Sequence, residues 1–161
     1  MNVKVTELVN DYNREKVFYD PSFQRRTVWS SKADGSPYAE ALSDGTAKEL
    51  SKIVIVDVRR SLSRALSSGC EEAVEYFESV LENGFEYISI DGQNRSKFVE
   101  DFFNNSVEIS GDFEDADGKV ISVTNKFFKD LPQRLQDGFR MSEVDLSVMT
   151  VGSRGRLSRL F

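Results

Sequence analysis

A carboxylate, an amide and a guanidinium lie together in the segment Asp91-Gly92-Gln93-Asn94-Arg95. The segment follows an apolar, strand-like run at residues 87–90 and precedes an amphipathic, helix-like run at residues 96–103. A strand that turns on glycine into a helix leaves backbone N–H groups and the positive end of the helix dipole directed outward. Arg95 could bind a phosphate there through two hydrogen bonds, and Asp91 could hold Mg²⁺ or orient a water molecule. The sequence therefore predicts the chemistry of this protein at the Asp91 turn.

The same turn also has a purely structural interpretation. Asp91 would then cap the helix, Gly92 would form the turn, and Arg95 would be a surface residue. For an Asp-Gly turn considered alone, this structural role is the more common one. A functional site is favoured by the combination of a carboxylate, an amide and a guanidinium at a single helix start.

A second candidate segment is Phe23-Gln24-Arg25-Arg26-Thr27-Val28-Trp29. It is dense in functional groups, because an amide and two guanidiniums lie between two aromatic residues. In a structural interpretation, Phe23 and Trp29 are core residues and the polar residues between them are solvated. Taken alone, the segment is weak evidence for a site.

The chain contains no histidine and a single cysteine, Cys70. Without histidine there is no Ser-His-Asp triad, no two-histidine zinc site and no histidine base of the ββα-metal nuclease type. One cysteine excludes an intrachain disulfide and a cysteine metal cluster. Cys70 is expected near the start of a helix, and we expect it to have no chemical role. Any catalysis would have to use carboxylates, amides, arginines and Mg²⁺.

The charge of the chain argues against non-specific DNA binding. The net charge is −6, and residues 71–86 contain six glutamates but neither lysine nor arginine. Non-specific DNA affinity comes from neutralising phosphates, which a globally acidic chain does poorly. Arginines nevertheless cluster at residues 25–26, 59–64 and 154–159, so the sequence is compatible with local pockets for a small anion.

The length of 161 residues predicts a single domain, residues 1–161, that folds without disulfides or metals. Apolar runs in the chain are all well short of the roughly 18 residues of a membrane span, and no signal segment opens the sequence. We therefore expect a cytoplasmic protein that does not contact a membrane.

Periodicity and turn residues predict the elements that position the two segments. The strongest strand is predicted at residues 53–58, where β-branched residues indicate a central strand buried on both faces. An acidic surface turn is expected at residues 112–117, in a hairpin that turns at or near Asp117-Gly118. Further strands are predicted at residues 16–19, 87–90, 107–109, 119–123 and 144–149, and helices at residues 6–13, 38–43 (after Ser36-Pro37), 71–83 (before Gly84), 96–103 and 132–140.

The order of the two polar segments resembles one known family. Phe-Gln-Arg at residues 23–25 with Trp29, followed by a strand into the Asp91 turn, is similar to the Tyr-Gln-Arg-x-x-x-Trp and Asp-Gly-Gln-Gln-Arg signatures of the N-terminal domain of GmrSD-type modification-dependent restriction systems. That domain belongs to the ParB/sulfiredoxin-like superfamily. Phe23 stands where the family commonly has tyrosine, and Asn94 where it has the second glutamine. The resemblance begins at about residue 17, and it implies that the family sequence continues past Phe161, so that this chain would be C-terminally truncated.

The resemblance implies an α+β fold with a ParB/sulfiredoxin-like mixed sheet flanked by helices. It also implies a site that binds and hydrolyses a nucleoside triphosphate with Mg²⁺ and thereby controls DNA cleavage. Asp91, Gln93 and Arg95 would be the catalytic residues, with Asp91 as the metal or water ligand. The remaining nucleotide-binding residues would be Gly92, Asn94, Gln24 and Arg25. DNA would be reached through a partner nuclease domain or chain, because the usual nuclease of these systems needs histidine.

Two other branches of the superfamily fit less well. Sulfiredoxins need a cysteine at the phosphate-binding turn, which contains none here. ParB proteins bind CTP through a different turn and clamp DNA with a helix-turn-helix module, for which 161 residues leave no room.

Three functions remain open from the sequence. The first is a nucleotide-binding, NTP-hydrolysing regulatory domain of a DNA restriction or antiphage system, or a phage-encoded relative of one. The second is a non-catalytic interaction or inhibitor protein that uses the same fold. The third is a Mg²⁺-dependent nuclease that uses Asp91 with another acid, although no Asp-x-Glu-x-Lys type of pattern follows a strand.

Overall fold

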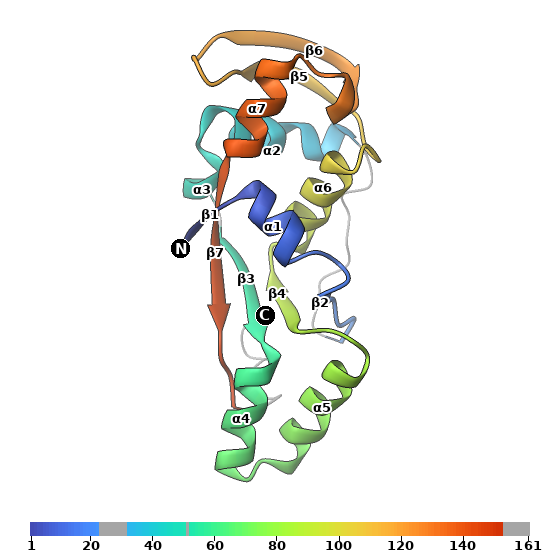
Figure 1. Cartoon of the computed structure of the whole chain (residues 1–161), viewed down its shortest axis with the longest axis vertical. Coiled ribbons are helices and arrows are strands. Elements are labelled where there is room, and N and C mark those ends of the chain that lie inside the picture. Colours follow the sequence, from blue (N-terminus) through green and yellow to red (C-terminus); the bar gives the residue numbers. More distant parts are fainter. Residues whose placement is uncertain (23–31, 51, 153–161) are drawn as a thin grey trace.

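A computed structural model describes residues 1–22, 32–50 and 52–152 of the chain. A five-stranded sheet with helices on both faces forms the middle of the molecule, and a two-stranded hairpin lies at one end (Figure 1). The strands are β1 (Asn2–Lys4), β2 (Val17–Phe18), β3 (Lys52–Asp57), β4 (Tyr87–Asp91), β5 (Ile109–Glu114), β6 (Val120–Lys126) and β7 (Glu143–Met149). The helices are α1 (Val5–Asp11), α2 (Lys32–Asp44), α3 (Ala47–Leu50), α4 (Val58–Ser68), α5 (Glu71–Glu82), α6 (Gln93–Phe103), α7 (Gln133–Met141) and the 3₁₀ turn η1 (Phe128–Asp130).

The strand predicted to be central is central. The order in the sheet is β1-β7-β3-β4-β2, so β3 has two neighbours on each side. β3 pairs parallel to β7 and antiparallel to β4, while β1 pairs antiparallel to β7 and β2 parallel to β4. The described fold is therefore α+β with a mixed sheet.

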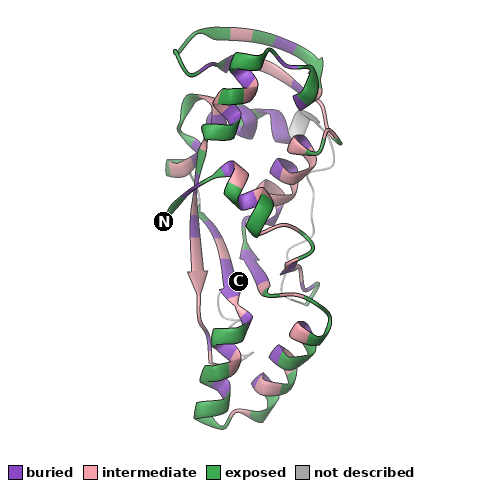
Figure 2. Cartoon of the chain, viewed as in Figure 1, coloured by how far each residue is buried: buried purple, intermediate pink, exposed green. Residues whose placement is uncertain are grey.

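Alternate residues of β3 face two separate hydrophobic clusters, as a two-residue side-chain period requires. Ile53 and Ile55 pack in the larger cluster, against α1, α2, α6, α7 and the β5–β6 hairpin. Val54 and Val56 pack in the smaller cluster, against α4 and α5. Figure 2 shows the buried residues on the sheet between these two groups of helices, whose outer faces are exposed.

Helix α4 was not predicted from the sequence, although its caps are clear. Asp57 accepts a hydrogen bond from the Arg60 backbone N–H (3.0 Å), and Gly69 ends the helix in the left-handed conformation at φ 72°. The helix contains four serines and three arginines in eleven residues, but Val58, Leu62 and Ala65 follow one another at spacings of four and three residues, so the amphipathic signal is present in the sequence. These three residues pack in the smaller cluster together with α5.

Helix α2 begins earlier than the Ser36-Pro37 pair predicts. It starts at Lys32 and contains Pro37 in its interior, a position where proline removes one backbone hydrogen bond. Ala39 and Leu42 are fully buried in the larger cluster, and the Ser36 hydroxyl accepts a hydrogen bond from the Ser110 backbone N–H (3.2 Å). Tertiary packing therefore offsets the local cost of the proline.

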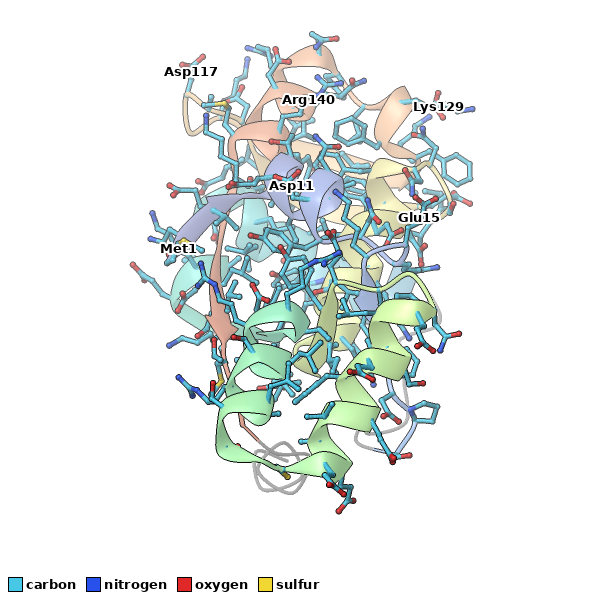
Figure 3. All side chains as sticks on the ribbon, turned by 60° about the horizontal axis from the view of Figure 1, so that its bottom comes forward. Met1, Asp11, Glu15, Asp117, Lys129 and Arg140 are labelled. Carbon is cyan, nitrogen blue, oxygen red and sulfur yellow. The ribbon has the colours of Figure 1, made fainter. Side chains whose placement is uncertain are left out.

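The acidic stretch 112–117 is only partly the surface turn that was expected. Asp112 and Glu114 belong to β5, and Asp115 is buried. Oδ1 of Asp115 accepts hydrogen bonds from the backbone N–H groups of Asp117 and Lys119, both at 2.9 Å, and so builds the turn before β6. Figure 3 shows Asp117 at the outer end of the molecule, the end that also carries Lys129 and Arg140. No helix in the described part of the chain could span a membrane.

Candidate functional site

The Asp91 turn joins a strand near the middle of the sheet to a helix that covers the sheet. β4 lies between β3 and β2 and ends at Asp91, and α6 begins two residues later at Gln93. Phe98, Val99 and Phe102 bury one side of α6 in the larger cluster, which fixes the helix on the sheet. The predicted geometry of a strand turning into a helix N-terminus is therefore present.

Gly92 is required at this turn for two reasons. Its φ of 85° lies in the left-handed region, which residues with a side chain rarely adopt. A Cβ at this position would also stand 3.0 Å from Cγ1 and 3.2 Å from Cα of Ile53, a residue of the adjacent strand β3. The turn can approach β3 this closely only because glycine has no side chain.

Asp91 does not cap α6, so the capping role considered for it is wrong. Gly92 occupies the N-cap position, and Oδ1 of Asp91 accepts a hydrogen bond from the N–H of Gly92 itself (2.8 Å). No side chain of the described residues caps α6, and its first turn contains no acidic residue. Asp91 is exposed, which leaves its other carboxylate oxygen toward solvent.

The two amide side chains of the turn are in different environments. Gln93 is buried, with 8% of its surface exposed. Oδ1 of Asn94 is buried and, among the described residues, has no hydrogen-bond donor. A buried acceptor without a donor costs about 1–3 kcal/mol, so Asn94 is placed to accept a hydrogen bond from a group that the described residues do not supply.

Arg95 is half-buried beside Tyr38 of α2. Burial raises the pKa of the Tyr38 hydroxyl to about 12, and the positive charge of Arg95 acts in the opposite direction. Within the described ranges, no carboxylate forms an ion pair with the Arg95 guanidinium. Arg95 thus brings an uncompensated positive charge to the first turn of α6, where the helix dipole also favours an anion.

Gln24 and Arg25 lie outside the described residues, but the chain on either side of them is held at α6. Before them, the Tyr19 ring lies under the Lys97 ammonium, 4.5 Å from ring centroid to Nζ, and Tyr19 hydrogen-bonds Ser96. After them, Gly35 lies so close to the Phe98 ring that a Cβ at Gly35 would overlap it. Tyr19 and Gly35 thus both contact α6, whereas Asp20 and Ser22, directly before residue 23, lie beside α5.

A polar cluster on α6 was missed in the sequence. Arg14, which precedes β2, pairs with Asp101 (Nη2 to Oδ1, 2.7 Å) and with Glu100 (Nε to Oε2, 3.4 Å), and it also reaches the Lys97 carbonyl oxygen at 3.4 Å. The spacing of three and four residues between Lys97 and the two acids is a helix-face signal. The partner Arg14 lies more than eighty residues away in sequence, so no local pattern identifies it.

Burial dominates the titration behaviour of this cluster. It raises the pKa of Tyr19 to about 12 and raises the pKa of Glu100 above its ordinary value, and Arg14 opposes both shifts. The pKa of Lys97 is lowered, first by burial and then by the positive charge of Arg14. Through Tyr19 and Arg14 the cluster holds the chain on either side of β2 against α6, and its Arg14–Asp101 ion pair is partly exposed.

A metal ion at the turn would have few protein ligands. In the described residues, no group of three histidine, cysteine, aspartate or glutamate side chains could hold a metal. Mg²⁺ is usually bound by one or two carboxylates together with substrate phosphates. The exposed carboxylate of Asp91 fits that role if the phosphates supply the remaining oxygens.

Comparisons of the chain with protein-family models, with curated proteins and with solved structures found no match. The function is therefore argued from the geometry of the site and from the resemblance of its two polar segments.

Proposed function

We propose that the chain is a nucleotide-binding regulatory domain that takes a nucleoside triphosphate, with Mg²⁺, at the Asp91 turn. The observation that carries the proposal is Arg95, whose guanidinium has no carboxylate partner among the described residues and stands in the first turn of a helix without a side-chain cap. A phosphate would receive two hydrogen bonds from Arg95 and the favourable field of the helix dipole. The unpaired acceptor of Asn94 adds a second position for a ligand contact.

The proposal assigns the other residues of the turn from their positions. Asp91 would hold Mg²⁺ on the phosphates or orient the water that attacks the terminal phosphorus. Gly92 allows the backbone to approach β3, and Gln93 would position the phosphate from a buried site. Gln24 and Arg25 would face the turn from the segment between Tyr19 and Gly35, two residues that both contact α6.

We further propose that the chain is similar to the N-terminal domain of GmrSD-type restriction systems, with a ParB/sulfiredoxin-like fold, and that it regulates DNA restriction or an antiphage response. Support comes from the order of the two polar segments and from the mixed sheet flanked by helices. Contact with DNA would be made by a partner nuclease domain or chain. A nuclease within this chain would need a second acid beside Asp91 to hold the metal, and the described residues contain no group of three histidine, cysteine, aspartate or glutamate side chains that could do so.

The test is the melting temperature with ATP, GTP, CTP and UTP, each with and without Mg²⁺. A ligand at about 100 times its dissociation constant stabilises by about 2.7 kcal/mol, a rise of roughly 5–10 °C for a chain of this size. We expect the rise in the wild type and in Arg59→Ala, which removes an exposed arginine of α4, but not in Arg95→Ala. An equal rise in all three proteins would move the ligand away from the turn, and no rise with any nucleotide would favour the non-catalytic interaction protein.

A further inference from the structure

A buried carboxylate outside the Asp91 turn has only neutral hydrogen-bond donors among the described residues. Asp20 follows β2 and has only 6% of its surface exposed. Its Oδ1 accepts a hydrogen bond from the Ser22 backbone N–H (2.8 Å), and its Oδ2 accepts one from the Tyr76 hydroxyl (2.6 Å). Both donors are neutral, and within the described part of the chain no lysine or arginine pairs with Asp20.

The burial of Asp20 bears on how strongly it could hold a ligand. The attraction between opposite charges is stronger at a site shielded from water than at an exposed one. A cation that reached the Asp20 carboxylate would therefore be held more strongly than one at a surface carboxylate. Its role in linking the end of β2 to α5 does not need a full negative charge, since a neutral acceptor would also take the Tyr76 hydrogen bond.

Asp20 lines a pocket of about 490 Å³ between the end of β2 and helix α5. Three of its lining residues are aromatic: Phe18 and Phe85, whose rings stack with centroids 5.2 Å apart, and Tyr76, which lies beside Asp20. The volume is in the range of pockets that enclose small molecules. A carboxylate next to aromatic faces is the combination that recognises organic cations, because ring faces also attract positive charge.

The surface around the pocket carries negative charge, which attracts a cation. Helix α5, which supplies Tyr76 and Ser79 to the pocket, has five exposed glutamates, none of which forms an ion pair with a described residue. Their summed negative potential raises the local concentration of cations near the pocket. The carboxylate, the aromatic wall and the acidic helix all favour the same sign of ligand.

We propose that this pocket binds a small organic cation, with an amidinium, guanidinium or primary ammonium group on an apolar or aromatic body. The cationic nitrogen would pair with Asp20, and the body would pack against Phe18 and Phe85. The pocket is a site of its own, on the α5 face of the sheet, whereas the proposed nucleotide site is built for an anion at the start of α6. Binding of the cation is thus independent of whether the Asp91 turn takes a nucleotide.

The experiment compares benzamidine with benzamide, which has nearly the same shape but no charge, by calorimetric titration of the full chain. We expect benzamidine to bind the wild type at least about tenfold more tightly than benzamide, as a buried ion pair would provide. Agmatine and an acetylated, amidated arginine distinguish a free small molecule from an arginine side chain presented by a peptide. If agmatine and the arginine derivative bind equally well, the pocket recognises the guanidinium group itself. If only the arginine derivative binds, the ligand is a peptide.

Two variants and one control locate the cation. Asp20→Asn keeps the shape and a hydrogen-bond acceptor but removes the charge, and Ser79→Lys places an ammonium at an exposed position of the pocket wall. Both should abolish the preference for benzamidine, while Glu78→Gln, which removes one exposed charge of the same helix outside the pocket lining, should retain it.

Equal binding of benzamidine and benzamide by the wild type would overturn the proposal. An unchanged preference in Ser79→Lys would do the same, and this variant decides the matter if circular dichroism shows that Asp20→Asn does not fold.

Discussion

Gly92 is the single residue on which the geometry of the Asp91 turn depends most directly. We expect Gly92→Ala to lower the free energy of unfolding by about 2–4 kcal/mol, because it combines a strained positive φ with a contact against Ile53. Gly118→Ala is the matched control, since Gly118 also has a positive φ (79°) but has open space where a Cβ would lie. That variant should cost only about 1–2 kcal/mol. Urea denaturation followed by circular dichroism measures both, and equal losses would show that Ile53 does not restrict the turn.

Also at the residue scale, the turn contains an acid and a base that do not neutralise each other. Asp91 accepts a hydrogen bond from Gly92, and Arg95 lies beside Tyr38. A salt bridge between them would stabilise the turn modestly and would occupy both groups. Their separation leaves each of them able to contact a ligand, which is the basis of the proposed function.

At the scale of elements, Arg14 joins the connection between α1 and β2 to the side of α6. Burial raises the pKa of Glu100 above its ordinary value of 4.5, so the folded protein holds this proton more tightly than the unfolded chain does. The stability that neutral Glu100 contributes is fully present below pH 4.5 and is lost as the pH rises through the higher pKa of the folded state.

Glu100→Gln should lack this loss, because glutamine stays neutral. The free energy of unfolding of the variant should therefore increase relative to that of the wild type between about pH 4 and pH 7, which means that the variant becomes relatively more stable. Arg14 keeps its closer partner Asp101 in the variant. Glu114→Gln, at an exposed position of the hairpin, controls for the removal of one carboxylate. A difference between Glu100→Gln and wild type that does not change with pH would contradict the prediction.

For the molecule as a whole, one sheet separates two hydrophobic clusters but belongs to both. Because alternate residues of β3 enter the two clusters, loss of either cluster also exposes one face of the sheet. We expect the α4–α5 end and the hairpin end, which lie at opposite ends in Figure 1, to unfold in a single transition.

Phe77→Ala tests this coupling from the smaller cluster. Phe77 is fully buried on α5, and its truncation should cost about 3–5 kcal/mol. Leu66→Ala, at a 59% exposed position of α4, should change stability by less than about 0.5 kcal/mol. Hydrogen exchange of the β5–β6 amides in Phe77→Ala is the decisive measurement, because protection there should fall together with protection in α5. Unchanged protection in the hairpin would mean that the two ends unfold separately.

The sequence alone determined the features that depend on neighbouring residues. The β-branched run of β3, the stripe and glycine end of α5, the turn of the hairpin and the strand–glycine–helix order at Asp91 follow from local periods and turn preferences. Helix α4 was missed because most of its residues are serine or arginine, although Val58, Leu62 and Ala65 lie at helical spacing. The start of α2 was misplaced because a proline normally lies at the beginning of a helix.

Only the tertiary structure decided which polar groups are buried and which distant groups they contact. Asp91 proved not to be a cap, the Asn94 oxygen proved to be buried without a donor among the described residues, and Asp20 proved to lie beside aromatic rings from β2, from α5 and from the segment after α5. Arg14 and its partners on α6 meet across more than eighty residues of chain. Burial and charge pairing depend on which distant segments pack together, and a local pattern of residue types carries no information about those distances.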